Sequence, residues 1–315
     1  MKGMILAAGL GTRLRPLSYE LPKPIVPVLG RPLCSYNMEF LLKAGVRTFV
    51  MNLHRQPKLI QQRVAGWTGK KVRVEYKVEP EILGTGGGIW NARDSLKEST
   101  FVTANSDTVV RFPFSSALAF HKEKKALATL VLFPDPDRRH TPVWIDGEGR
   151  ITGFGPAAPG DRSGFYTGFQ IVEPAFLREI PPGRKSCIVR DTYARLASDG
   201  APVFGFLTSG YFREFGSPSD YLVGTLALLS EMQGQKANHS SIPSGLAVTP
   251  PVYISPGANI ATGALIGPEA VIEDGAVVKE GASVTRAILW PGAVLDAGQR
   301  ISQAILTPRR RVEIS

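Results

Sequence analysis

The C-terminal part of the chain repeats an aliphatic residue at every sixth position, a pattern that few folds can produce. The repeat runs without a gap through Ile254, Ile260, Ile266, Ile272, Val278 and Val284, and glycine follows four of these positions three residues later, at 257, 263, 275 and 281. One buried aliphatic side chain per hexad is typical of a left-handed parallel β-helix, in which three hexads complete one coil. The pattern predicts a short β-helix of two to three coils with a less regular end over 287–306, because in an ordinary hairpin it would be a coincidence.

Before this tail, helical and extended patterns alternate along the chain. Apolar spacing predicts helices over 32–45, 57–64, 88–96, 115–124 and 219–232, and strands over 48–53, 72–76, 100–104 and 128–133. Such alternation indicates an α/β fold, a Rossmann-like and mainly parallel mixed sheet with helices on both faces. Short strands and Gly-Pro breakers over 141–176 predict an antiparallel lobe that closes over a second substrate. The predicted division is a first domain over 1–236, a breaker-rich linker over 237–251 and the β-helix over 252–315.

A glycine-rich loop follows the first apolar strand. Residues 4–8 are apolar, and two glycines, a threonine and two arginines follow within 9–15. Backbone N–H groups and cationic side chains at a strand-to-loop junction suit an anion such as a polyphosphate, and glycine permits close approach and positive φ. The loop matches neither generic phosphate signature, because Leu14 stands where the dinucleotide fingerprint has its third glycine, and the Gly-Lys-Ser/Thr ending of a P-loop is absent.

The loop 6–16, Leu-Ala-Ala-Gly-Leu-Gly-Thr-Arg-Leu-Arg-Pro, and the Pro-Lys-Pro at 22–24 together resemble the signature of the nucleotide-sugar pyrophosphorylases, or sugar-1-phosphate nucleotidyltransferases. The layout with a hexapeptide-repeat tail is closest to the mannose-1-phosphate guanylyltransferases. The resemblance implies that Arg13 and Lys23 are catalytic, holding the phosphates during transfer, with Arg15 as a helper. It implies a nucleotide site that includes Leu6, Ala7, Ala8, Gly9, Gly11, Thr12 and Arg13.

Two carboxylates are candidate ligands for Mg²⁺. Asp107, in Asn105-Ser106-Asp107, follows a predicted strand at its carboxyl end, where a hard divalent cation can bind; a helix cap or turn is the other interpretation. It matches the magnesium aspartate of the family, which makes it the third catalytic residue and Asn105 a nucleotide contact. The segment 212–221 resembles the family pattern W-x-D-I-G-T-P-x-x-Y, with Glu214 in place of the usual aspartate. The longer glutamate side chain can still reach the ion.

The base of the nucleotide remains open between guanine and uracil. Residues 81–88, Glu-Ile-Leu-Gly-Thr-Gly-Gly-Gly, resemble the base-reading E-P-L-G-T-A-G loop of the family, with Glu81 and Gly86 as nucleotide contacts. A carboxylate accepts from both N–H donors of guanine, which favours GTP. The three consecutive glycines look more like the N-acetylmuramate-1-phosphate uridylyltransferases, which would use UTP and an N-acetylated sugar.

The sugar side departs most from the family pattern. Thr167 and Gly168 resemble the sugar-contacting T-G turn, and Asp191 stands where the family often has an acidic residue; with Lys23 they form the predicted substrate site. The family's Glu-Lys-Pro and Tyr-Gly-Val are absent, replaced by Gly-Phe-Gly-Pro at 153–156 and Thr-Pro-Val-Trp at 141–144. Arg162 or Arg190 is the predicted substitute for the missing lysine.

Composition excludes several other classes of function. The net charge is +10, yet 250–315 hold six acidic and six basic residues, so the excess cations lie in 1–249. Two short basic clusters, at 122–125 and 309–311, have no interleaved aromatics, which argues against a nucleic-acid partner and leaves an anionic small substrate. No apolar run is long enough to span a bilayer. The first predicted strand follows Met1-Lys2-Gly3 directly, so no signal peptide is expected. The two cysteines do not have the spacing of a metal site or a redox motif. We therefore expect a cytoplasmic protein without a membrane partner.

The predicted reaction joins an NTP and a sugar 1-phosphate into an NDP-sugar and pyrophosphate. One alternative is acetyl transfer, which hexapeptide β-helices often host on a histidine base, but none of the four histidines lies in 250–315. The tail is therefore predicted to mediate homo-oligomer formation or regulation. The other alternative is a non-catalytic regulatory homologue. The intact Arg13, Lys23 and Asp107 argue against it, whereas Glu214 and the missing Glu-Lys-Pro leave it open.

Overall fold

The computed structural model describes residues 1–69, 72–156, 160–234 and 246–314, which form two compact units. Unit 1 comprises Met1–Leu10, Pro22–Pro24 and Cys34–Arg213, and unit 2 comprises Gly11–Leu21, Ile25–Leu33 and Glu214–Ser315. Most of the predicted linker, residues 237–245, lies outside the described residues. The domain boundary at 236 therefore stays a prediction.

Unit 1 is built on a nine-stranded mixed sheet, in which β8 and β12 extend from the path β10-β9-β11-β6-β1-β4-β5. Its strands are β1 Lys2–Leu6, β4 Thr48–Leu53, β5 Arg73–Val78, β6 Phe101–Asn105, β8 Ala128–Phe133, β9 Pro142–Ile145, β10 Ile151–Phe154, β11 Arg162–Val172 and β12 Val203–Leu207. β1, β4, β5 and β6 are parallel to one another, and β11 runs antiparallel to β6 and β8. A two-stranded sheet pairs β7 Thr108–Arg111 with β13 Tyr211–Glu214. The predicted α/β class is confirmed.

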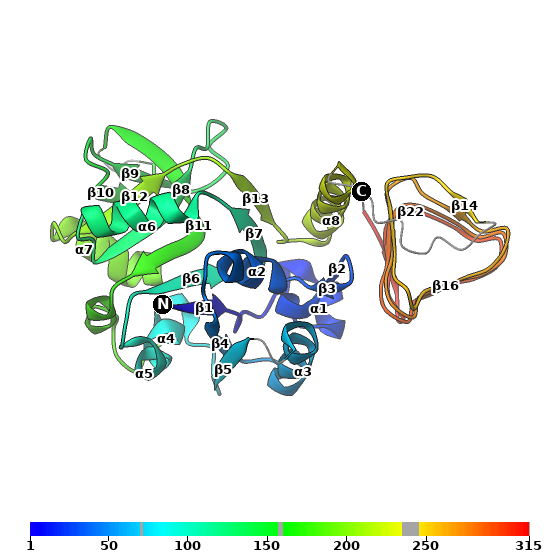
Figure 1. Ribbon diagram of the computed structural model, residues 1–315, viewed down its shortest axis with the longest axis horizontal. Coiled ribbons are helices and arrows are strands. Elements are labelled where there is room, and N and C mark those ends of the chain that lie inside the picture. Colours follow the sequence, from blue (N-terminus) through cyan, green and yellow to red (C-terminus); the bar gives the residue numbers. More distant parts are fainter. Residues whose placement is uncertain (70–71, 157–159, 235–245, 315) are drawn as a thin grey trace. The chain divides into compact units, whose positions relative to one another are not determined.

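Helices cover both faces of this sheet (Figure 1). They are α2 Ser35–Lys43, α3 Pro57–Thr68, α4 Gly84–Asn91, α5 Arg93–Leu96, α6 Phe114–Glu123 and α7 Ala194–Ser198, with a 3₁₀ helix η3 at Pro174–Arg178 and a π-helix η4 at Ile188–Tyr193. Side chains alternate between the faces of a strand. On β11, Val172 belongs to the same hydrophobic core cluster as Ile89 of α4 and Leu196 of α7, whereas the Phe169 ring contacts Phe40 of α2.

The antiparallel lobe predicted over 141–176 is present. β9 pairs with both β10 and β11 in antiparallel register, joining Ile145 to Ile151 on one side and to Arg162 on the other. Its closure over a second substrate stays a prediction. Among the residues that the structure describes, no helix combines the length and the apolar character needed to cross a lipid bilayer.

Unit 2 contains a C-terminal strand stack, defined as Ala247–Glu313, in which parallel strands lie on one another in successive coils (Figure 1, yellow to red). Val252 pairs with Ala270, Ala270 with Ala287, and Ala287 with Ala304, so the first of these coils is slightly longer than the two that follow. The repeat residues 266, 272, 278 and 284 are buried. The end predicted to be less regular continues the same stack, and the shortening of the coil by a single position explains why the six-residue period is lost there.

The strands of the stack are β14 Ala247–Val248, β15 Val252–Ile254, β16 Asn259–Ile260, β17 Leu265–Ile266, β18 Ala270–Ile272, β19 Val277–Val278, β20 Ser283–Leu289, β21 Val294–Leu295, β22 Arg300–Leu306 and β23 Arg311–Glu313. Unit 2 also holds the 3₁₀ helix η1 Thr12–Leu14, α1 Leu17–Glu20, the hairpin of β2 Pro27–Val28 and β3 Arg31–Pro32, and α8 Pro218–Gly234. The residues of the 3₁₀ helix η2 Lys23–Ile25 are divided between the two units. α8 confirms the helix predicted over 219–232.

A buried carboxylate joins the stack to the β2–β3 hairpin. Glu273 is only 1% exposed, and both of its oxygens accept from the Gly30 N–H, at 3.0 and 3.2 Å. Burial raises the pKa of Glu273 from 4.5 to about 7; the backbone N–H groups of Gly30 and Leu29 oppose this shift, and the Asp274 charge adds to it. The folded chain therefore binds this proton more tightly than the unfolded chain does between pH 4.5 and 7.

This linkage predicts that Glu273→Gln alters the pH dependence of stability. Because the folded pKa lies above the unfolded one, this contribution to the free energy of unfolding is complete below pH 4.5 and is lost as the pH rises to 7. The variant should lose that component, so urea unfolding at pH 5 and pH 8 should differ less than in the parent. Glu280→Gln, an exposed carboxylate on the same stack, is the control. An unchanged pH dependence in Glu273→Gln would contradict the assignment.

Candidate active site

The two segments that carry the predicted phosphate and metal residues leave the sheet side by side. β1 and β6 are parallel neighbours with Leu6 opposite Asn105, and the Ser106 N–H donates to the Leu6 carbonyl at 3.2 Å. The carboxyl ends of parallel strands meet at one edge of a sheet, where ligands of this architecture bind. The structure thus brings the predicted nucleotide residues Leu6, Ala7 and Ala8 together with Asn105.

An ion pair joins the predicted catalytic lysine to the predicted metal carboxylate. Lys23 Nζ lies 2.7 Å from Asp107 Oδ2, and the two side chains are 8% and 27% exposed. The lysine is thus enclosed, whereas the carboxylate reaches solvent. An anionic ligand entering here would meet a cation already held in place.

The donor set fits a divalent cation that keeps water or phosphate ligands. Asp107 offers hard carboxylate oxygens, and within the described part of the chain no three His, Cys, Asp or Glu side chains gather into a metal cluster. Mg²⁺ is usually held by one or two carboxylates together with substrate phosphates and water. A protein cage is therefore not required.

In unit 2 the second predicted carboxylate pairs with the first signature arginine. Gly11 takes a φ of 64° and η1 follows it, with Arg13 Nη2 2.5 Å from Glu214 Oε1. Downstream, Ser217 and Asp220 form a reciprocal capping box at the start of α8, the Ser217 N–H donating to Asp220 Oδ2 and the Asp220 N–H to Ser217 Oγ. The cap fixes the chain directly after Glu214.

A buried network links the glycine-rich loop to the predicted base-reading loop within unit 1. The Ala7 N–H donates to Asn52 Oδ1 at 2.9 Å, and Asn52 Nδ2 donates to Glu79 Oε1 at 2.7 Å. The other Glu79 oxygen accepts from the Leu83 N–H at 3.0 Å, just before α4. Sequence reasoning passed over Asn52 and Glu79. The available signal was a polar residue next to the last position of β4, which pairs with Leu6 of β1.

Glu79→Gln should destabilise the protein. Each of the two Glu79 oxygens accepts from an N–H donor. In glutamine one of these oxygens becomes an NH₂ group, which cannot accept, so one buried N–H donor would lose its partner. An unsatisfied buried donor costs about 1–3 kcal/mol. Urea unfolding should show a loss of that size in the free energy of unfolding. Glu81→Gln, two residues away and exposed, should stay within about 0.5 kcal/mol of the parent. Equal stability of the two variants would contradict a structural role for Glu79.

The predicted base contacts lie at the start of α4. Glu81 is exposed, whereas Gly86 is buried and its N–H donates to the Ser186 carbonyl at 2.9 Å. Gly88 lies against the buried network, because an added Cβ there would come within 2.6 Å of Asn52 Nδ2. Glu81 is thus accessible to a ligand, and the glycines serve close packing.

The predicted sugar residues occupy two places in unit 1. Thr167 is buried and its hydroxyl donates to the Val131 carbonyl at 2.9 Å, while Gly168 lies against Asn105. Asp191 lies on η4 and accepts from Arg190 Nε at 3.0 Å. The Arg190 guanidinium, with the Cys187 N–H, lowers the pKa of Asp191. The structure therefore pairs Arg190, one predicted substitute for the missing lysine, with a predicted sugar contact.

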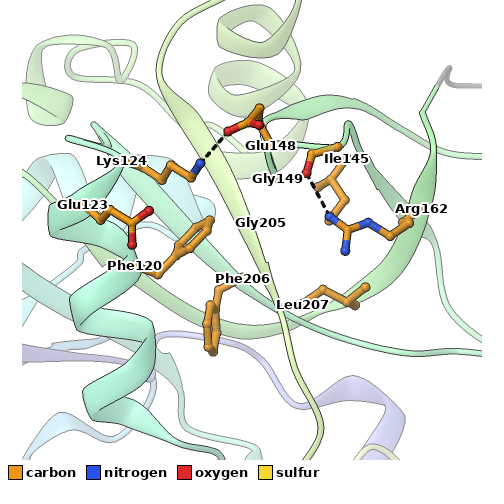
Figure 2. A pocket seen from close by; sticks show the side chains of 11 residues that line it. Phe120, Glu123, Lys124, Ile145, Glu148, Gly149, Arg162, Gly205, Phe206 and Leu207 are labelled. Atoms are coloured by element: carbon orange, nitrogen blue, oxygen red, sulfur yellow. Dashed lines mark hydrogen bonds and ion pairs between the residues drawn. The ribbon is translucent and has the colours of Figure 1, made fainter.

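Arg162, the other predicted substitute, lines a cavity of about 380 Å³ (Figure 2). The cavity has aromatic walls from Phe120 and Phe206, and an ion pair between Lys124 and Glu148 of 2.7 Å beside it. The stretch of strand from Arg162 to Gly168 spans roughly 20 Å. Arg162 is therefore remote from the T-G turn along β11.

A second cavity of about 370 Å³ is lined by basic side chains that sequence reasoning did not single out. Arg138, Arg139 and His140 line it together with Trp144 of β9. The His140 ring stacks on Phe165 with 4.1 Å between centroids, and His140 Nδ1 lies 3.2 Å from Asp135. Cationic side chains and an indole are groups that suit a sugar phosphate.

Comparison with known proteins agrees with this geometry. A family model described as nucleotidyl transferase matches residues 2–231. A mannose-1-phosphate guanylyltransferase of Mycobacterium tuberculosis is 29% identical over 259 residues, 78% of this chain and 71% of the relative. A mannose-1-phosphate guanyltransferase of Yarrowia lipolytica is 32% identical over 262 residues, 81% of this chain and 70% of the relative. HddC from Yersinia pseudotuberculosis, crystallised with GMP-PN, has a TM-score of 0.61 at 26% identity, covering 72% of this chain and 99% of that one. The chain therefore belongs to the nucleotidyl transferase family of nucleotide-sugar pyrophosphorylases.

Proposed function

We propose that the chain is a sugar-1-phosphate nucleotidyltransferase that joins GTP and mannose 1-phosphate into GDP-mannose and releases pyrophosphate. The observation that carries the proposal is the Lys23–Asp107 pair, held within unit 1 where the loop after β1 and the segment after β6 leave the sheet. The names of the relatives support the guanine and mannose assignments, and the exposed Glu81 supplies a carboxylate for the guanine N–H donors.

In the proposed reaction an oxygen of the sugar phosphate attacks the α-phosphorus of the nucleotide in line. The new P–O bond forms as the bond to the α–β bridging oxygen breaks, and that electron pair leaves with pyrophosphate. Such transfers depend on positioning and charge stabilisation rather than on a covalent catalyst. The Lys23 ammonium and the Arg13 guanidinium would balance the phosphate charge, and the backbone N–H groups of the glycine-rich loop would orient it.

Enzymes of this family generally use a divalent metal, and we propose Mg²⁺ with Asp107 and Glu214 as its protein ligands. A bound Mg²⁺ supplies charge neutralisation on the phosphates and on the departing pyrophosphate. Glu214 is already balanced by Arg13 and Asp107 by Lys23.

We further propose that the C-terminal strand stack is a left-handed parallel β-helix that mediates homo-oligomer formation, in a cytoplasmic protein. Support comes from the regular parallel stacking of its coils and from Leu265 and Val294, which are 53% and 45% exposed. Sedimentation of the parent and of a Leu265→Ser, Val294→Ser double variant tests the assembly. Acetyl transfer is not favoured, because the stack contains no histidine.

The deciding experiment is pyrophosphate release with Mg²⁺, crossing GTP, UTP, dTTP, CTP and ATP with mannose, glucose, N-acetylglucosamine and N-acetylmuramate 1-phosphates. GTP with mannose 1-phosphate should give the highest kcat/KM. UTP with an N-acetylated sugar would establish the alternative substrate pair instead. No release from any pair, in protein shown to be folded, would refute the activity and leave the regulatory interpretation.

The base assignment predicts a selective effect of Glu81→Gln. Replacing the carboxylate removes one acceptor for the two guanine N–H donors, so kcat/KM for GTP should fall about 10- to 100-fold, as expected for an unmet hydrogen bond of about 1–3 kcal/mol. The value for UTP should change less than about threefold. A parallel fall for both nucleotides would contradict a role in reading the base.

A further inference from the structure

A set of contacts left unused by the proposed reaction lies inside unit 2, between α1 and the C-terminal strand stack. Glu20 ends α1, which begins directly after the signature loop 6–16. Its carboxylate is almost enclosed, with 8% of the side chain exposed, and its Oε1 accepts from Arg310 Nε at 2.7 Å. The same oxygen accepts from the Thr307 hydroxyl at 2.8 Å. A nearly buried carboxylate that accepts from two donors holds a more defined geometry than an ion pair on the surface does.

The partner of Glu20 is itself a fixed turn. Thr307 and Arg310 flank the connection between β22 and β23, and the Thr307 N–H donates to the Arg310 carbonyl at 2.9 Å. The Thr307 hydroxyl oxygen also accepts from the N–H groups of Arg309 and Arg310, at 3.2 and 3.0 Å. The turn therefore presents both donors to Glu20 in a preset arrangement.

A second set of contacts holds the β2–β3 hairpin on the stack. Glu273 accepts from the Gly30 N–H, as described above. Trp290 Nε1 of the stack donates to the Tyr221 hydroxyl of α8 at 2.9 Å, and that hydroxyl donates in turn to the Pro27 carbonyl. Two separate segments near the start of the chain are thus fastened to the stack at separate points.

The first of these segments carries Arg13. The backbone hydrogen bonds of this segment join residues close in sequence: the Leu14 N–H donates to the Gly11 carbonyl, and the Leu21 N–H donates to the Leu17 carbonyl. Leu14 and Leu17 are fully buried. Short-range turn hydrogen bonds alone stabilise such a segment weakly, so its order depends on the burial of Leu14 and Leu17 and on the contacts that its ends make.

We propose that the C-terminal strand stack positions the nucleotide-binding loop, with Glu20 and Arg310 as the positioning residues. The proposal rests on the proposed function insofar as Arg13 binds the phosphates of the nucleotide. An anchored loop is already ordered before the nucleotide binds. In a loosened loop, the conformational entropy lost on ordering lowers the affinity for the nucleotide. The effect therefore belongs in KM for the nucleotide and not in the chemical step.

The test compares Arg310→Ala with Arg310→Lys, which keeps a cation for Glu20, and with Arg309→Ala, an exposed neighbour in the same turn. Arg310→Ala should raise KM for the nucleotide about tenfold, with kcat and KM for the sugar phosphate changing less than about twofold. Arg310→Lys and Arg309→Ala should stay within about threefold of the parent. Glu20→Gln, which keeps the shape of the side chain, serves as the second variant and should reproduce the rise in KM.

Amide hydrogen exchange supplies a readout that does not depend on the activity. In Arg310→Ala the segment 11–21 should exchange at least about tenfold faster, while β1, β4 and the inner strands of the stack keep the exchange rates of the parent. Unchanged exchange over 11–21, or a uniform increase over the whole of unit 2, would overturn the proposal. If the parent enzyme releases no pyrophosphate from any substrate pair, the proposed function fails, and the exchange result still decides the positioning role.

Discussion

Asp107→Asn is expected to abolish pyrophosphate release, lowering kcat/KM by about 10³-fold, because it removes the negative charge that pairs with Lys23 and that we propose holds Mg²⁺. The side chain keeps its shape, so the loss reports charge and not packing. Preorganised charges aimed at a transferring phosphoryl group typically account for effects of this size. The measurement is steady-state pyrophosphate release at saturating Mg²⁺ with the preferred substrate pair.

The same substitution leaves Lys23, 8% exposed, without its partner. An unpaired enclosed cation destabilises a fold, so thermal unfolding must show that the variant is folded at the assay temperature. Asp94→Asn is the matched control, because Asp94 pairs with Lys97 in an ion pair on the surface and is 64% exposed. Retention of more than about a tenth of the activity in Asp107→Asn would contradict the assigned role.

Gly168→Ala is expected to lower kcat/KM about 10- to 100-fold through Asn105. Gly168 has a φ of 86°, and a Cβ added there would lie 2.4 Å from Asn105 Nδ2 and 2.8 Å from its Cγ. Contacts this short force the Asn105 side chain to turn away from its position at the end of β6. Since Asn105 is a predicted nucleotide contact, the loss should appear with every nucleotide tested.

Gly155→Ala separates this collision from backbone strain. Gly155 has a φ of 96°, close to that of Gly168, but an added Cβ would have no neighbour within 4 Å. Both variants carry the cost of a left-handed residue, on the order of 1–3 kcal/mol in the free energy of unfolding. Only Gly168→Ala should lose activity, and equal activity losses in the two variants would assign the effect to strain.

Local patterns in the sequence were sufficient to predict the repeating parts of the structure. The aliphatic repeat from Ile254 to Val284 predicted stacked parallel strands, since a period of six arises from one inward side chain per short strand. The apolar strand before Asp107 placed that residue at a carboxyl edge of the sheet, and the structure has it there beside Lys23. These features depend on residues near one another in the chain.

The long-range partners could not be predicted in the same way. Asn52 lies near the end of β4 and Glu79 directly follows β5. Their hydrogen bond depends on the pairing of β4 with β1 on one side and with β5 on the other. Glu20 and Arg310 are 290 positions apart and carry no local signal, because a glutamate ending a short helix is ordinary. The extension of α4 back to Gly84 was also unexpected, since its glycines disfavour helix.

The direction of β23 has a consequence for contacts between copies of this chain. The ladders that join β15, β18, β20 and β22 are parallel, whereas β23 runs antiparallel along Ala304–Leu306, with Arg311 opposite Leu306 and Glu313 opposite Ala304. A bare parallel edge invites another strand to join it, and a reversed strand carrying charges blocks that addition. A second molecule therefore cannot continue the ladder through Ala304–Leu306.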